Sequence, residues 1–257
     1  LLTGSYPPTE YDGVGRLTHL MAQGLFELGH TVHVIARAEQ EKVSFYDGAF
    51  VHRIPFRTDR YARYRDYPTL HSTLNYSHAV HERVKRLILN EGVQLVDSTL
   101  WQYQGLVTLA SGEVPVVVRL LTGERQVASV HRDQSEDLAL VGEMEGLLLK
   151  RAQHLLPNTK ATLQSTKDLY GVPDIDGRCS IVPYGIVPAP DELARPYDLA
   201  RAAGPFTVLF VGRLEKRKGI MDLFAVSRQG AAYEVAAARM QALGGAVKYF
   251  KCRLDPA

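Results

Sequence analysis

Hydrophobic and polar positions along the chain follow two alternating patterns. Short runs rich in Val, Ile, Leu and Phe are separated by longer segments in which apolar residues recur every three or four positions. The first pattern is typical of buried β-strands and the second of amphipathic helices. Regular alternation of the two predicts an α/β fold with a largely parallel sheet.

These patterns give the bounds of the expected elements. We predict strands at residues 1–3, 31–35, 50–54, 93–96, 114–120, 154–157, 180–182 and 206–211. We predict helices at residues 17–28, 74–89, 136–151 and 162–170. Gly29 follows the first helix at the position where a residue with positive φ ends many helices.

A proline-rich segment divides the pattern into two parts. Residues 185–205 contain four prolines, a composition typical of an inter-domain linker. We therefore expect an amino-terminal domain at 1–184, a hinge at 185–205 and a second α/β domain at 206–257. The last part has room for about two strand–helix steps, roughly half or less of an independent doubly wound domain. The second domain is therefore expected to be incomplete in this chain.

The composition narrows the class of protein. The 257 residues are 46% hydrophobic and 23% charged, which fits a globular chain of one to two domains and excludes wholesale disorder. A net charge of +2 argues against nucleic acid as a partner. No apolar run approaches the roughly 18 residues of a membrane helix, and Cys179 and Cys252 cannot form a disulfide framework. We therefore expect a cytoplasmic protein.

Gly13, Val14 and Gly15 stand just ahead of the first predicted helix. Glycine lets the backbone approach a ligand closely, and the amides at a helix N-terminus attract anions. A Rossmann dinucleotide loop is disfavoured, because Thr18 stands where the third glycine belongs and the loop from Gly4 is long. The residues alone leave two alternatives open, a phosphate-binding loop or a flexible connection.

A basic loop, residues 212–219, follows the strand predicted at 206–211. It combines two glycines with Arg213, Arg217 and Lys218. Cations at the carboxyl end of a strand in an α/β sheet are suited to binding a diphosphate. A solvated basic turn is the alternative, since charged side chains usually lie in solvent.

The two glycine-containing segments lie on successive α/β units, and further motifs accompany them. Residues 6–8, 13–16, 28–34, 181–186 and 211–219 resemble the signature of family 4 glycosyltransferases of the GT-B fold. The resemblance implies two Rossmann-like domains with parallel sheets, the second incomplete here. It also implies transfer of a sugar from a nucleotide-diphosphate sugar to an acceptor hydroxyl, with retention of the anomeric configuration and without a metal or other cofactor.

The resemblance also assigns roles to particular residues. The donor diphosphate is expected to contact Gly13, Val14, Gly15, Arg213 and Lys218. Arg213 and Lys218 are expected to act in catalysis, because fixed cations stabilise the charge that builds on a leaving diphosphate. The acceptor-side candidates are Arg16, Arg63, Trp101, Tyr103 and Arg119. Trp101 and Tyr103 are as consistent with core packing as with stacking on a sugar.

The chain departs from the family pattern at two places. Leu121, Thr122 and Gly123 replace the His-Thr-Pro of many members, and His131 substitutes for that histidine only if its loop folds back. The Glu-x7-Glu pair that holds the donor in the family is not found after Phe224. We expect that sequence is missing after residue 224 and beyond residue 257.

The segment 53–67 is the densest mixture of basic and aromatic residues in the chain. It contains Arg53, Arg57, Arg60, Arg63 and Arg65 together with Tyr61, Tyr64 and Tyr67. Arginines pair with phosphates and tyrosines favour interfaces, so one interpretation is contact with an anionic acceptor or with the acidic inner face of a membrane. An exposed loop that binds no ligand is the other interpretation.

Two other classes of function stay open. A truncated GT-B chain that binds a sugar, a glycan or a protein partner without turnover has the same motifs. An NAD(P)-dependent oxidoreductase ranks lower, because it needs an intact glycine fingerprint. Metal binding is not expected, since Asp174 and Asp176 lie in a turn-rich loop and His78 and His81 lack an acidic or cysteine partner at ligand spacing.

Overall fold

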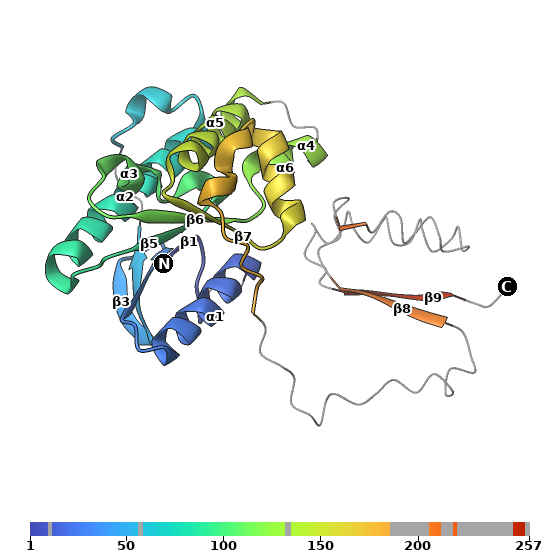
Figure 1. Cartoon of the computed structure of the whole chain (residues 1–257), viewed down its shortest axis with the longest axis horizontal. Helices are drawn as coiled ribbons and strands as arrows, with labels where there is room; N and C mark the ends of the chain where they lie inside the picture. Colours follow the sequence, from blue (N-terminus) through green and yellow to red (C-terminus); the bar gives the residue numbers. More distant parts are fainter. Residues whose placement is uncertain are drawn as a thin grey trace. The chain divides into compact units, whose positions relative to one another are not determined.

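The computed structural model of the chain (Figure 1) describes residues 1–9, 12–55, 59–131, 135–185, 206–211, 218–219 and 249–254. The chain divides into two compact units, Leu1–Val187 and Pro188–Ala257. The boundary falls inside the proline-rich segment 185–205. The expected role of this segment as a hinge stays a prediction, because residues 186–205 lie outside the described residues.

Two neighbouring sheets build the first unit. Their strands are β1 (Leu2–Thr3), β2 (Val32–Arg37), β3 (Lys42–Tyr46), β4 (Ala49–Ile54), β5 (Val96–Thr99), β6 (Val116–Leu120) and β7 (His154–Pro157). One sheet has the order β1-β2-β4-β3, in which only β3 runs antiparallel to its neighbour. The other has the order β5-β6-β7 and is parallel throughout. The sheets adjoin where β1 contacts β5, which gives the Rossmann-like arrangement that the alternating pattern predicts.

Helices cover both faces of these sheets. They are α1 (Gly13–Glu27), α2 (Pro68–Glu91), α3 (Leu106–Ser111), α4 (Glu124–His131), α5 (Glu136–Arg151) and α6 (Lys160–Tyr170). Short 3-10 helices are η1 (Ala62–Tyr64), η2 (Trp101–Tyr103) and η3 (Pro173–Arg178). Figure 1 shows α1 on one side of the sheets and α2, α3 and α5 on the other. None of the described helices is both long enough and apolar enough to cross a bilayer.

Two consecutive residues of β2 show why helices pack on both faces of the sheet. Val34 packs in a small cluster with Ala22 of α1, whereas Ile35 belongs to the larger core beneath α2. Successive side chains of a strand point to opposite faces of the sheet, so a strand covered on both sides reads as a continuous apolar run. Val34, Ile35 and Ala36 form such a run in β2, and all three are buried.

Several elements have the bounds expected from the sequence. The helix at 136–151 and the strands at 154–157 and 206–211 are observed at those residues. The first helix ends as expected, because Gly29 has a φ of +86° directly after the cap residue Leu28.

One expected strand is absent, and one observed strand was not expected. Residues 180–182 form no strand; Cys179 makes an isolated bridge to Leu155, and the Val182 amide donates to the Pro157 carbonyl. Strand β3 was not expected from the sequence; its apolar residues Val43 and Phe45 are 52% and 58% exposed.

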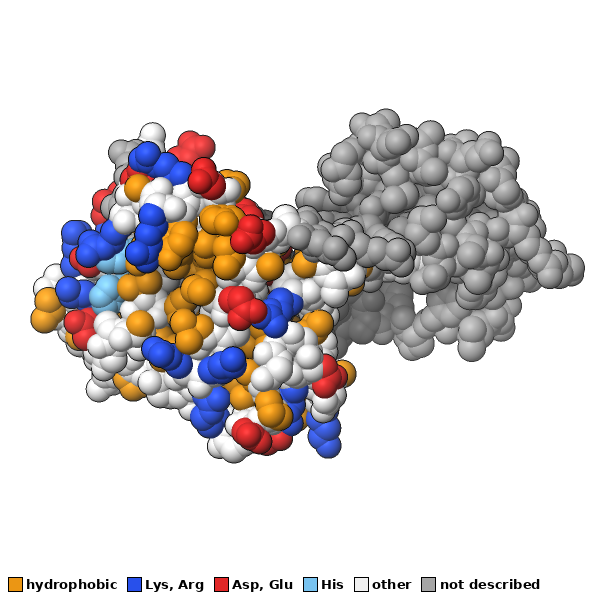
Figure 2. Space-filling model, turned by 90° about the horizontal axis from the view of Figure 1, so that it is seen from above, with side chains coloured by type: hydrophobic (Ala, Val, Ile, Leu, Met, Phe, Trp, Pro, Cys, Tyr) orange, Lys and Arg blue, Asp and Glu red, His pale blue; other side chains and the backbone are white. Residues whose placement is uncertain are grey.

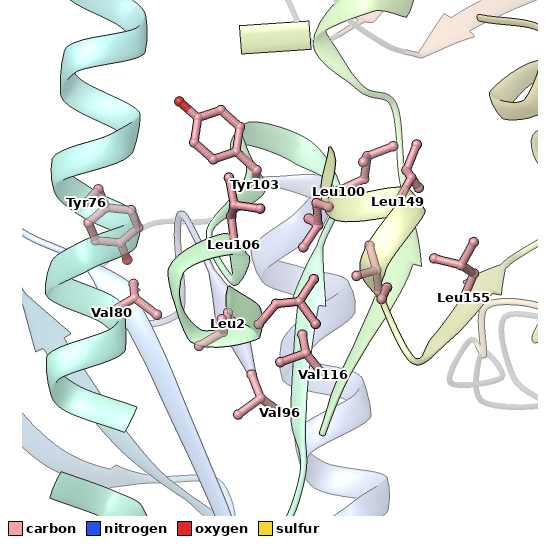
Figure 3. Packing of buried hydrophobic residues seen from close by; sticks show 14 of the residues in the cluster. Leu2, Tyr76, Val80, Val96, Leu100, Tyr103, Leu106, Val116, Leu149 and Leu155 are labelled. Atoms are coloured by element: carbon pink, nitrogen blue, oxygen red, sulfur yellow. The ribbon is translucent and has the colours of Figure 1, made fainter. Parts of the chain in front are cut away.

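The larger core lies between the sheets and the helices α2, α3 and α5. Leu2, Val96 and Val116 lie close together in it, from three adjacent strands (Figure 3). Tyr76 of α2 and Leu149 of α5 reach it from the helical side. This packing fixes the ends of the strands, from which the loops of the candidate site extend.

In the second unit the structure describes one strand pair. It consists of β8 (Phe206–Val211) and β9 (Tyr249–Leu254), which are antiparallel. A parallel neighbour for β8, as expected for a Rossmann-like domain, is absent from the residues described in this unit.

Candidate functional site

The candidate site lies where the parallel strands of the first unit end. The loop after β1 meets the loop after β5 there, since a Cβ on Gly4 would lie 3.5 Å from Nε2 of Gln104. Proteins with parallel α/β sheets bind their ligands at this edge, because loops and helix N-termini converge on it. The glycine segment, Trp101 and the loop 121–123 all follow strands at this edge.

The glycine segment forms the first turn of α1 rather than a loop before it. Gly13 is the first helical residue, and Asp12 is the N-cap, whose carboxylate accepts a hydrogen bond of 2.6 Å from the Gly15 amide. This carboxylate already satisfies the Gly15 amide and places a negative charge at the positive end of the helix. A diphosphate that binds here therefore competes with Asp12 for the Gly15 amide.

The two glycines differ in their surroundings. Gly15 is buried, and a Cβ at this position would lie 2.5 Å from Oγ and 2.8 Å from the carbonyl oxygen of Ser5. Gly13 is exposed, and a Cβ there would meet no atom within 4 Å. Gly15 therefore lets α1 pack closely on the loop after β1, whereas Gly13 faces open space where a ligand has room.

Arg119 is held in an ion pair rather than facing solvent. It is 3% exposed, and its Nε donates to Oδ1 of the buried Asp97 at 2.5 Å. Its Nη1 donates to Oγ1 of Thr18 at 3.2 Å, which connects β6 to α1. These partners hold the Arg119 guanidinium inside the first unit, where it connects elements of the fold. Its expected contact with an acceptor stays a prediction.

The two aromatic candidates after β5 lie in different environments. Tyr103 is 0% exposed, and its hydroxyl forms a hydrogen bond with Thr73 of α2. Figure 3 places Tyr103 within the apolar core, so core packing is its role in this structure. Trp101 is only half-buried, and of the two it is the one with surface available to a sugar.

The residues of the basic and aromatic segment 53–67 lie in different environments. Arg53 belongs to β4, is 8% exposed and donates to the Pro7 carbonyl at 2.7 Å and to Thr9 Oγ1 at 2.9 Å. Arg53 thus lies in the strand expected at 50–54, and neither interpretation of the segment 53–67 describes it; it supports the loop after β1. The tyrosines of the segment pack against the core, whereas Arg63 is exposed with its guanidinium 4.7 Å from the centre of the Tyr64 ring. Arg57 lies outside the described residues.

An open groove of about 460 Å³ lies between β4 and α2. Its lining includes Arg60, Arg83 and Arg86, and Arg83 is paired with Glu41. Cationic side chains gather beside histidines on one flank of the face shown in Figure 2, next to a largely hydrophobic middle. The glycine segment and Trp101 are not among the residues that line this groove.

The remaining expected residues have varied positions. Arg16 is exposed in the first turn of α1. Lys218 is exposed, whereas Arg213 lies outside the described residues, so the cation pair stays a prediction.

Asp176 lies in η3 and forms an ion pair of 2.5 Å with Lys167. Across the described parts of the chain, no group of three or more His, Cys, Asp or Glu residues is arranged to hold a metal ion.

Glu145 is a residue of interest that we did not predict from the sequence. It is 0% exposed in α5, and burial raises the pKa of its carboxyl to about 7. A signal was present, because Val141, Glu145 and Leu148 follow one another at helical spacing on the buried face of α5. An acid within an apolar helical stripe indicates a paired buried group.

Comparisons with known proteins identify the family of the first unit. A search of curated proteins gave no match. The family profile described as Glycosyltransferase Family 4 matches residues 11–189, well over half of the 257 residues. The match begins at the N-terminus of α1 and spans the remaining strands and helices of the first unit. The chain therefore belongs to glycosyltransferase family 4.

Proposed function

We propose that the protein transfers a sugar from a nucleotide-diphosphate sugar to an acceptor hydroxyl, with retention of configuration at the anomeric carbon. Family membership supports glycosyl transfer in general. The observation that carries the proposal further is the position of Gly13, which is exposed at the N-terminus of α1 with open space where a side chain would stand. Such a terminus favours an anionic group, as a diphosphate requires.

The proposed chemistry places negative charge on the departing nucleoside diphosphate. Backbone amides at Gly13 and Val14 and the cations Arg213 and Lys218 neutralise that charge in this proposal. Fixed donors that meet the charge as it develops lower the barrier more than they stabilise the bound donor. No metal ion is needed when side-chain cations supply this stabilisation.

Acceptor binding is assigned to the first unit. Arg16 and Arg63 are exposed cations, and Trp101 has a partly exposed ring that suits stacking on a sugar. A reaction in the cytoplasm agrees with the absence of a disulfide framework. Contact of the segment 53–67 with an acidic membrane has weaker support, because its tyrosines pack against the core.

The direct test is release of nucleoside diphosphate by the full-length protein from UDP-, GDP- and ADP-sugars, with and without EDTA. The proposal expects one donor class to be used and EDTA to have no effect. Arg213→Ala should weaken nucleoside diphosphate binding by at least about tenfold, the value of one charge-assisted hydrogen bond. Lys216→Ala, in the same basic loop, is the matched control. Unchanged affinity of Arg213→Ala in calorimetry contradicts the assignment.

A non-catalytic binding module is the second candidate. A truncated GT-B chain that binds without turnover carries the same motifs as the enzyme, and a Glu-x7-Glu pair in the native gene would decide for the enzyme. This candidate expects the protein to bind a nucleotide sugar or a glycan and to release no diphosphate from any donor. The same screen, combined with calorimetry, therefore separates the two functions.

A further inference from the structure

Glu145 is a carboxyl group in the middle of the larger core. Its side chain is fully buried in α5, and an isolated carboxylate in such a place is costly. Three donors surround it: the Gln102 amide at 3.1 Å on Oε1, and the Glu124 amide at 2.8 Å and the Tyr170 hydroxyl at 2.5 Å on Oε2. The group is therefore well paired in the ionised form.

The donors come from three separate segments. Gln102 lies in η2 after β5, Glu124 begins α4 after the loop that follows β6, and Tyr170 ends α6. Two of these segments follow parallel strands at the edge where ligands bind. Gln102 has a φ of +54°, a conformation that non-glycine residues adopt only when their surroundings hold them there. The bond from its amide to Glu145 is one such constraint.

Gly123 lies in close contact with the Glu145–Tyr170 pair. A Cβ at Gly123 would lie 2.1 Å from the Tyr170 hydroxyl and 3.1 Å from Oε2 of Glu145. The hydroxyl thus occupies the space that a side chain at position 123 would take. The Glu145–Tyr170 pair therefore lies directly against the loop 121–123.

We propose that Glu145 is a positioning residue that holds the loops after β5 and β6, and with them Trp101 and Thr122, in place at the ligand-binding edge of the sheet. The part of the proposal that concerns catalysis rests on the proposed function. The positioning itself does not, since it concerns only contacts within the first unit.

Protonation of Glu145 is expected to loosen the arrangement. A carboxylate accepts all three hydrogen bonds, whereas a carboxylic acid carries a proton on one oxygen and loses an acceptor there. Burial raises the pKa of Glu145 to about 7, although its three donors act in the opposite direction. The donors lower the pKa of a Glu145 carboxyl that stays buried, so by linkage they bind its ionised form more strongly than its protonated form. Their hold on the loops is therefore firmest above about pH 7.

The ionisable groups that face Glu145 do not replace it as the titrating group. Glu124 of α4 raises the Glu145 pKa further, and burial and Glu145 itself raise the pKa of Tyr170. Tyr103 of η2 also has a raised pKa because of burial. Arg125 of α4 lies over the Tyr170 ring, 5.1 Å from its centre. Helix α3 contains no ionisable residue, and no charged residue of α2 is among the groups that shift the Glu145 pKa.

The chain contains a direct reporter of this titration. Trp101 is its only tryptophan and is adjacent to Gln102. Fluorescence of the full chain between pH 5.5 and 8.5 should show a transition centred near the Glu145 pKa of about 7. Glu145→Gln, which cannot ionise, should abolish it. Glu143→Gln is the control, because Glu143 is an exposed residue of the same helix paired with Arg125. A wild-type protein without a transition, or a transition retained in Glu145→Gln, overturns the proposal.

Tyr170→Phe provides a second test that keeps the carboxyl group. The Tyr170 hydroxyl lowers the Glu145 pKa, so its removal should move the fluorescence midpoint upward by about one pH unit, as for a hydrogen bond to a charged group. An unchanged midpoint overturns the proposal even if Glu145→Gln fails to fold. If the protein transfers sugar, Glu145→Gln should lower kcat/KM for the acceptor while the KM for the donor stays unchanged. Without transfer activity, the fluorescence result still decides whether Glu145 positions the loops.

Discussion

Arg119 of β6 and Asp97 of β5 form an ion pair in which both side chains are buried, 3% and 8% exposed, with 2.5 Å between Nε and Oδ1. The same guanidinium donates to Thr18 of α1 and to the Leu2 carbonyl of β1. One cation thus connects four elements around the point where the two sheets adjoin. A buried charge in this position is tolerated only because every neighbour pairs with it.

Asp97→Ala should strongly destabilise the first unit. The substitution leaves the Arg119 guanidinium buried without its carboxylate, which costs about 3–5 kcal/mol in comparable pairs. Glu143→Ala removes the partner of Arg125 in an ion pair whose glutamate is 65% exposed, and its cost should stay below about 1 kcal/mol. Urea denaturation of both variants provides the measurement, and equal losses for the two would contradict the structural role of the buried pair.

Gly15→Ala should lower the stability of the first unit, whereas Gly13→Ala should leave it nearly unchanged. A methyl group at position 15 would clash with the Ser5 backbone, so α1 must shift at a cost of about 1–3 kcal/mol. A methyl group at position 13 meets nothing, and the free energy of unfolding should change by less than about 1 kcal/mol.

If Gly13 is where a diphosphate approaches the backbone, Gly13→Ala should still weaken pyrophosphate binding in calorimetry. Stability can be followed by thermal unfolding in the same samples. If Gly13→Ala lost stability while Gly15→Ala stayed as stable as the wild type, the prediction would be wrong.

Asp12→Ala should separate the stability of α1 from its affinity for anions. The Asp12 carboxylate caps the Gly15 amide at 2.6 Å, and loss of such a cap costs about 1 kcal/mol. The same change removes a negative charge from the helix N-terminus and frees an amide for a ligand. Pyrophosphate affinity should therefore rise while thermal stability falls. A fall in both quantities would show that Asp12 assists the ligand rather than competing with it.

Acid should destabilise the first unit through a histidine pair under α2. Nδ1 of His33 lies 3.0 Å from Nε2 of His52, and burial lowers the pKa of His52 from 6.5 to about 4. The folded state therefore favours neutral His52. Its contribution to stability is complete above pH 6.5 and is lost as the pH falls from 6.5 toward 4.

Urea midpoints measured at steps between pH 7.5 and 4.5 check this dependence. His52→Gln should flatten it, because a neutral amide replaces the titrating ring. His30→Gln is the control, since His30 is exposed. An identical acid dependence in His52→Gln and the wild type would exclude the histidine pair as the cause.

The sequence determined the order and type of most elements in the first unit. Strand β7 and helix α5 have the expected bounds, because their apolar residues repeat with a period that the chain itself carries. The glycine segment was also found from the sequence, as were the motifs at 28–34 and 181–186, and all of them lie within the residues 11–189 that the family profile matches. In each case the signal depends on neighbours within one element.

The tertiary structure decided which polar residues are buried and what they contact. Arg53, Arg119 and Tyr103 were candidates for ligand contact, with core packing left open for Tyr103 and a loop that binds no ligand left open for Arg53; their partners lie on the β1 loop, on β5 and on α2. Glu145 acquires its role from donors at positions 102, 124 and 170. Periodicity reports which face of an element is covered, but the partner of a buried polar group comes from elements far away in sequence. Only the packing of those elements brings such partners together.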